Sequence, residues 1–378
     1  MIIRAPRIRE EENEICVSAR VDFDRSDLNV PREVWYRFPM DYTDFVTDRI
    51  EGFLVGLLPT AMALGEPVFV EAPISPRLAS GLREYQRIQN SWWPDEFHIV
   101  EVNYEAFRTS PGVARTAVGS SFSGGVDSFH TLWQHLAPNE PLPAARITHC
   151  LMINGFDKDV DLDLTGSFQS TFDTYVPMMR NIGVRLLVSR NNLQAFRKNG
   201  IPSKRLARSH AAPLAASALI LGNLWGRFYI PGARPYDSLV PDGAHPMLDH
   251  LFSTEELVFC HDGAHSSRPK KIESITEWPE THSRLRVCFK RPTFDVNGTV
   301  QNCCKCLKCT DTMLALDLLG VLDRYVTFPH RLKRQQIWKT PMRAQLRSEY
   351  LGLARRNKRR DRAFDLMCSA ARSSFKRH

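Results

Sequence analysis

Strand-like runs and helical segments alternate along the middle of the chain, and this alternation constrains its fold more than any other feature. Runs rich in β-branched and aromatic residues lie at 116–122, 147–154, 184–190 and 227–232. Between them, apolar residues recur at helical spacing in segments 127–136, 162–183 and 209–225. Strands that alternate with helices of this length form a parallel sheet covered on both faces. The sequence therefore predicts an α/β domain over residues 116–240.

Three other regions flank this domain. Residues 1–115 mix strand-like runs with helical spacing, which predicts an N-terminal α+β domain. In residues 241–330 the periodicity weakens and cysteines gather, so we expect an acceptor-site and metal-binding segment there. Residues 331–378 are predicted to form a basic helical tail.

No stretch of the sequence is typical of a membrane span. The most apolar candidate, residues 52–65, is too short to cross a bilayer and contains Pro59. The first residues turn acidic where a signal peptide would need an apolar core. We therefore expect a cytoplasmic protein without a membrane partner. Its 378 residues, 43% of them hydrophobic, can bury a large core.

The segment Ser-Gly-Gly-Val-Asp-Ser, residues 123–128, lies between a predicted strand and a predicted helix. A turn in this position offers unpaired backbone N–H groups and the positive end of the helix dipole. Gly124 and Gly125 let the backbone approach an anion, while the hydroxyls of Ser123 and Ser128 can donate to it. Asp127 would repel a phosphate unless Mg²⁺ bridged the two groups. The segment thus predicts a phosphate-binding loop with a magnesium ion.

Four of the nine cysteines fall within residues 303–309. Because cytosolic thiols are kept reduced, a metal explains this crowding better than disulfides do. Four thiolates suit a tetrahedral structural Zn²⁺, and an iron–sulfur cluster is the alternative. The predicted ligands are Cys288, Cys303, Cys306 and Cys309. Cys304 is left over, either as a buried spare thiol or as a reactive one.

The string SGGVDS resembles the SGGxDS signature of the PP-loop ATP pyrophosphatases, the adenine nucleotide alpha hydrolase superfamily. The resemblance implies a flavodoxin-like, HUP-type sheet that holds the pyrophosphate of ATP in this loop. It also implies cleavage between the α and β phosphates, with AMP transferred to an oxygen of the substrate before a nucleophile displaces it.

Together with the cysteines, the loop is most similar to the 7-cyano-7-deazaguanine synthase family. The stretch IPGARPYDSLVPD carries a second part of the likeness, which implies a nucleotide contact at Gly232 and acceptor contacts at Asp237 and Asp242. Gly243 stands where that family has cysteine, so the acceptor is left open. The resemblance implies an ATP-dependent ligase that adenylates a carboxylate or amide oxygen of a small molecule or peptide and delivers nitrogen to it.

Other residues are candidates for the same site. Arg268 and Lys271 could reach ATP phosphates, although an exposed basic helix start is the alternative. Asn154 and Gly155 end the second predicted strand of the sheet, where ligands of such sheets bind, and we expect adenine or ribose contacts there. With Asp127 and Ser128, Lys271 completes the predicted catalytic set. His261 and Asp262 are either an acid–base pair, a second metal site or a structural hydrogen bond.

The tail holds 15 Lys and Arg against 3 Asp and Glu. Such a segment could bind RNA phosphates, and a solvated or subunit-contacting helix is the alternative. A tRNA-modifying PP-loop enzyme and a non-catalytic nucleotide sensor are therefore the alternative functions. We also expect a homo-oligomer.

Overall fold

The computed structural model describes residues 1–109, 112, 115–156, 166–198, 206, 209–290, 292–340 and 342–375. The chain divides into two compact units, each built from segments that are distant in the sequence. Unit 1 contains Met1–Ser121, His135–Leu164 and Gly183–Ala264. Unit 2 contains Phe122–Gln134, Thr165–Ile182 and His265–His378.

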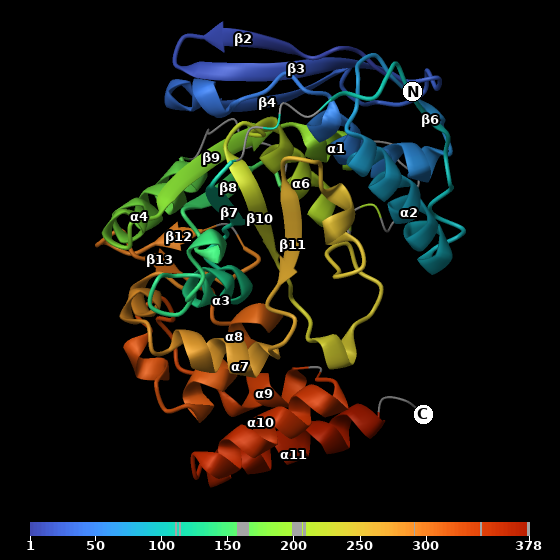
Figure 1. The fold of residues 1–378 in the computed structure, drawn as a ribbon. Coiled ribbons are helices and arrows are strands. Elements are labelled where there is room, and N and C mark those ends of the chain that lie inside the picture. Colours follow the sequence, from blue (N-terminus) through green and yellow to red (C-terminus); the bar gives the residue numbers. More distant parts are fainter. Residues whose placement is uncertain are drawn as a thin grey trace. The chain divides into compact units, whose positions relative to one another are not determined.

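Unit 1 contains an 11-stranded sheet with the strand order β11-β10-β7-β8-β9-β4-β3-β1-β5-β6, and β2 pairs with β3 (Figure 1). Five neighbouring strands are parallel. Their bounds are β7 Ala117–Ser121, β8 His149–Asn154, β9 Arg185–Asn191, β10 Trp225–Pro231 and β11 Val258–Asp262. All residues of these strands except Arg185 are buried or half-buried, as expected for parallel strands covered on both faces.

The N-terminal strands belong to the same sheet. They are β1 Ile2–Ile3, β2 Arg7–Glu11, β3 Glu14–Asp22, β4 Glu33–Pro39, β5 Val68–Val70 and β6 Val102–Tyr104. Strand β4 joins them to the parallel strands, because Tyr36 and Arg37 pair antiparallel with residues of β9. Strand β6 begins at Val102, and shortly before it the N–H of His98 donates to the carbonyl of Met62.

The helices of unit 1 are α1 Glu51–Leu64, α2 Pro76–Trp92, α5 Leu193–Lys198 and α6 Ala211–Ile220. Nearly every residue of α1 and α6 is buried, which explains why their apolar residues occupy all faces. Helix α2 is amphipathic and begins with Pro76 after Ser75, whose hydroxyl accepts from the N–H of Leu78 at 3.0 Å. Four parallel strands end at one edge of the sheet, at Ser121, Asn154, Pro231 and Asp262.

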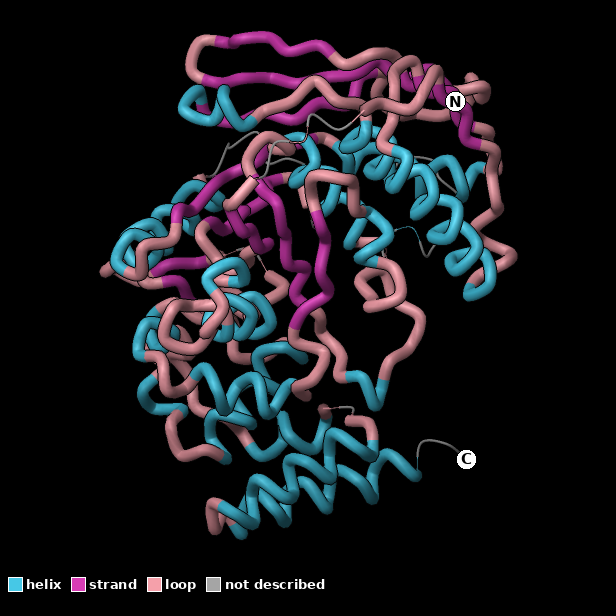
Figure 2. The backbone as a smooth tube through the Cα atoms, in the orientation of Figure 1, coloured by secondary structure: helices cyan, strands magenta, loops and turns pink. Residues whose placement is uncertain are grey.

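Unit 2 is mostly helical, as its cyan segments in Figure 2 make clear. Its helices are α3 Val126–Gln134, α4 Ser167–Asn181, α7 Arg268–Ile275, α8 Leu307–Leu318, α9 Arg334–Lys339, α10 Ala344–Arg356 and α11 Arg360–Phe375. A short hairpin joins β12 Thr293–Phe294 to β13 Val300–Gln301. Phe122, Phe129 and Tyr175 pack edge to face and connect the start of α3 with α4.

The mixed α/β class with a large, mostly parallel sheet is confirmed, and the predicted basic tail is helical. The boundaries at 115, 240 and 330 stay predictions. Among the described residues, no helix combines the length and the apolar composition needed to cross a bilayer.

Candidate functional site

The segment predicted to bind phosphate forms a tight turn at the start of α3 in unit 2. Gly124 has φ +72°, a conformation that L-residues with a side chain adopt only at a cost. A Cβ atom at this position would also overlap the hydroxyl of Tyr175. That hydroxyl is held in place because it donates to the carbonyl of Arg284 at 3.1 Å. Both the backbone and its surroundings therefore require glycine at 124.

The two serines of the segment hold the turn closed. The Ser128 hydroxyl donates to the carbonyl of Gly125 at 3.1 Å and accepts from the N–H of Ser123 at 3.3 Å. The Ser123 hydroxyl accepts from the N–H of Gly125 at 3.3 Å. The first N–H groups of α3 have no acceptor within the helix, so the turn presents donors where an anion could bind.

Asp127, on the first turn of α3, faces two cations from α7. Its carboxylate lies 3.1 Å from Lys271 Nζ and 3.5 Å from an Arg268 nitrogen. The Lys271 side chain is 1% exposed, and those of Asp127 and Arg268 are 24% and 19% exposed. Burial works to raise the pKa of Asp127, but the charges of Lys271 and Arg268 outweigh it and hold that pKa below its ordinary value. The two cations are thus not a solvated helix start.

A second set of contacts holds Arg268. Its Nε lies 2.9 Å from the Asp311 carboxylate, and one of its terminal nitrogens donates to the Thr312 hydroxyl at 3.2 Å. Tyr350, buried on α10, donates to Asp311 at 2.7 Å. Burial opposes the charge of Arg268, yet Asp127 and Asp311 together raise its pKa. Arg268 therefore stays charged and fixed in orientation between two carboxylates.

Arg286 is a functional candidate that the sequence did not reveal. Its backbone N–H donates to the carbonyl of Gly124 at 2.8 Å. Its side-chain Nε is buried, and no described residue accepts a hydrogen bond from it. Lys308 is a further missed cation, because its charge also lowers the pKa of Asp127. No motif marks either residue; the only local signal is that each lies within two residues of a predicted cysteine ligand.

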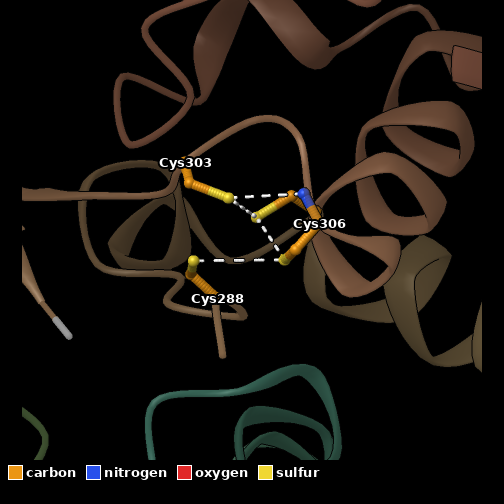
Figure 3. A group of neighbouring side chains, drawn as sticks. Cys288, Cys303 and Cys306 are labelled. Atoms are coloured by element: carbon orange, nitrogen blue, oxygen red, sulfur yellow. Dashed lines mark hydrogen bonds between the residues drawn. The ribbon is translucent and has the colours of Figure 1, made fainter. Parts of the chain in front are cut away.

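The four predicted cysteine ligands converge in unit 2. Figure 3 shows the thiols of Cys288, Cys303 and Cys306 directed toward one another, and all four sulfur atoms, including that of Cys309, lie within 4.8 Å. Three of the sulfur pairs are 3.4, 3.8 and 4.0 Å apart. Tetrahedral Zn–S bonds of about 2.3 Å place sulfur atoms about 3.8 Å apart, so the cluster could hold a metal ion such as zinc.

The thiols of the cluster differ in how readily they ionise. Burial opposes ionisation of Cys303, but hydrogen bonds from the N–H groups of Lys305 and Cys306 lower its pKa to about 6. Burial raises the pKa of Cys288 and of Cys309. A cation bound here would supply the charge that stabilises the other thiolates.

Cys304 does not join the cluster. It is 2% exposed, its φ is +55°, and its thiol donates to the carbonyl of Asn302 at 3.4 Å. Burial raises the pKa of this thiol. The structure therefore favours a buried spare thiol over a reactive one.

The remaining predicted contacts lie in unit 1. Asn154 ends β8, Gly155 follows it with φ +99°, and Gly232 follows β10. Asp237 is exposed in a short 3-10 helix, whereas Asp242 is partly buried with Arg234 at 3.6 Å. These five residues thus belong to unit 1, whereas Ser123, Gly124, Gly125, Asp127, Ser128, Arg268 and Lys271 belong to unit 2.

His261 pairs with Asp249 at 2.6 Å, not with Asp262. Asp262 instead contacts His135 at 3.1 Å. His261 and Asp262 are consecutive residues of a strand, so their side chains point to opposite faces. The hydrogen-bonded structural histidine is the interpretation that this geometry supports.

The basic tail is partly neutralised inside unit 2. Arg359 and Arg362 pair with Asp317 of α8 at 2.9 and 2.6 Å, and Arg334 pairs with Asp365 at 2.8 Å. These arginines contribute to packing between helices. Other tail cations, such as Arg355 and Lys358, are exposed.

Comparisons of the chain with protein-family models, with curated proteins and with solved structures gave no match.

Proposed function

We propose that this protein is an ATP-dependent, AMP- and pyrophosphate-forming enzyme that transfers nitrogen to an acceptor carboxylate or amide. The observation that carries the proposal is the Asp127 carboxylate held between Lys271 and Arg268, beside a Ser-Gly-Gly turn at the start of a helix. Acid and cations in this arrangement are what a magnesium-bound polyphosphate requires.

Different residues of unit 2 would bind the phosphates of ATP and stabilise the leaving pyrophosphate. The N–H groups of the turn and the hydroxyls of Ser123 and Ser128 donate to the phosphates of ATP. Lys271 and Arg268 turn toward those phosphates and stabilise the negative charge that develops on the leaving pyrophosphate. Because Lys271 is almost fully buried, it acts in a medium where its charge is weakly screened.

The reaction needs two displacements. An acceptor oxygen attacks the α-phosphorus, the bond to the bridging oxygen breaks, and pyrophosphate leaves with that electron pair. A nitrogen nucleophile then attacks the activated carbon and loses a proton, while AMP leaves with the oxygen. No side chain of the protein forms a covalent bond, so positioning and electrostatics provide the catalysis.

Asp127 suits a magnesium ligand, since its carboxylate is 24% exposed and remains ionised. Bound Mg²⁺ would neutralise phosphate charge and orient the α-phosphorus. The four-cysteine cluster provides thiol ligands alone, which fits a closed structural zinc site with no part in the displacements.

The test is ATP-dependent pyrophosphate release with AMP identified by mass. A small-metabolite extract and bulk tRNA serve as alternative sources of the acceptor. Lys271→Met should abolish release, because a buried cation facing the phosphates is lost. Lys270→Met is the matched control on the same helix, since Lys270 is exposed, and it should retain activity.

The three outcomes separate the candidate functions. Release stimulated by metabolites and lost in Lys271→Met supports the proposal. Stimulation by tRNA alone favours the tRNA-modifying alternative, for which the exposed tail cations are the supporting observation. ATP binding without release under either condition would support a nucleotide sensor and contradict the proposal.

A further inference from the structure

Two chain segments connect the four-cysteine cluster with the Ser-Gly-Gly turn, all within unit 2. The first segment leads into Cys288. Two residues earlier, the N–H of Arg286 donates to the carbonyl of Gly124 at 2.8 Å. Another two residues earlier, the carbonyl of Arg284 accepts from Tyr175, the residue that packs against Gly124.

The buried side-chain amide of Asn302 links this segment by hydrogen bonds to the cysteines that follow. The Asn302 side chain accepts from the N–H groups of Val287 and Cys288 at 2.9 and 3.1 Å and donates to the carbonyl of Leu285 at 2.8 Å. Asn302 is 2% exposed and directly precedes Cys303. A metal that joins Cys288 to Cys303 would therefore fix the segment from which Arg286 braces the turn.

The second segment is α8, which starts after Cys306 and carries Cys309 in its first turn. Asp311 and Thr312 follow within the next turn and hold Arg268 at 2.9 and 3.2 Å. Arg268 in turn contacts Asp127 at 3.5 Å. A metal that anchors the start of α8 would thus fix the residues that orient Arg268.

We infer that a metal ion bound by the four cysteines holds the Ser-Gly-Gly turn in its anion-binding shape, with Asp311 as the positioning residue that connects the two. The metal touches no nucleotide in this scheme. It acts through Arg286 on the backbone of Gly124, and through Asp311 and Arg268 on Asp127. The inference rests on the proposed function only in the test that measures ATP binding.

The first test measures backbone hydrogen exchange in the full chain without nucleotide. Amides of residues 123–129 should exchange about 5- to 150-fold faster in the metal-free chain, the range of typical coupling free energies, and Zn²⁺ should restore their protection. Amides of α2 should change little, because that helix belongs to unit 1 and carries no cysteine. Equal exchange with and without Zn²⁺, or equal acceleration throughout α2, would overturn the inference.

The second test uses metal-loaded variants that keep all four cysteines. Asp311→Asn should weaken binding of Mg·ATP about 5- to 150-fold and remove the part of its dependence on Zn²⁺ that acts through Arg268, while the part that acts through Arg286 remains. Asp317→Asn is the matched control, because Asp317 also lies on α8, with a side chain 14% exposed against 11% for Asp311, but pairs with Arg359 and Arg362 of the tail. It should leave ATP affinity unchanged.

The two readouts keep the inference distinct from the proposed function. An Asp311→Asn chain whose ATP affinity responds to Zn²⁺ as fully as the unaltered chain would refute the role of Asp311. If the unaltered chain binds no ATP at all, the proposed function fails, while the hydrogen-exchange result still decides whether the metal orders the turn.

Discussion

Replacement of Gly124 by alanine tests the geometry of the turn most directly. The substitution adds a methyl group at φ +72°, in a space that the Tyr175 hydroxyl already fills. The left-handed backbone costs an L-residue about 1–2 kcal/mol. Overpacking against a buried, hydrogen-bonded tyrosine adds about 1–3 kcal/mol. We therefore expect Gly124→Ala to lower the free energy of unfolding by about 2–5 kcal/mol in total.

Gly320→Ala separates the two contributions. Gly320 belongs to the same unit and has φ +74°, but a Cβ atom there has no neighbour within 4 Å. Its replacement should cost only the backbone part, about 1–2 kcal/mol. Urea unfolding followed by circular dichroism measures both variants, and ATP binding is measured alongside. Equal losses of stability, or full ATP affinity in Gly124→Ala, would refute the argument that Tyr175 encloses the turn.

Three further predictions concern charge and the metal. Arg286→Gln should weaken Mg·ATP binding about tenfold or more, as loss of a charge-assisted hydrogen bond does. Arg284→Gln should have little effect on this binding, because the Arg284 guanidinium already pairs with Glu280. Calorimetric titration of both variants with Mg·ATP measures the difference. The pKa of Asp127 is depressed, so its ion pairs stabilise the fold above the ordinary aspartate pKa of about 3.9 and lose this effect as pH falls through the lower folded value. The difference in unfolding free energy between the unaltered chain and Asp127→Asn should accordingly be constant from about pH 6 to 8 and shrink below about pH 4, and a constant difference down to about pH 2 would contradict it. Cys309→Ser should lower Zn²⁺ affinity by more than the about 10- to 100-fold typical of outer contacts, while Cys304→Ser should keep one zinc per chain by elemental analysis.

Local patterns in the sequence predicted most residues of the candidate site. The turn at 123–128 and the four-cysteine cluster could be predicted from residue spacing alone, because the residues that form each of them lie close together in the sequence. Tyr175, Arg286 and Asp311 were not predictable in this way. Each comes from a segment without a motif, and its role exists only because unit 2 assembles three distant stretches of chain.

The fold shows the same division between local and non-local information. Most strands and helices of residues 116–240 were predictable from periodicity, since apolar residues gather in strands that are covered on both faces. The short helix α5 was not predicted. The pairing of β4 with β9 was not, because residues 36 and 191 carry no pattern that specifies one another. His261 illustrates a further limit, in that its sequence neighbour Asp262 lies on the opposite face of the strand and the actual partner is Asp249.

The interleaved order of the two units has a consequence for how the protein is made. Lys271 follows Asp127 by 144 residues, so at about 5–20 residues per second the ribosome would deliver the lysine roughly 7–29 s after the aspartate. The cysteine ligands come later still. During this interval the nascent chain exposes Phe129 without Trp278, against which its ring packs in the folded protein. We expect this stage of synthesis, rather than the finished protein, to be where chaperones engage the chain.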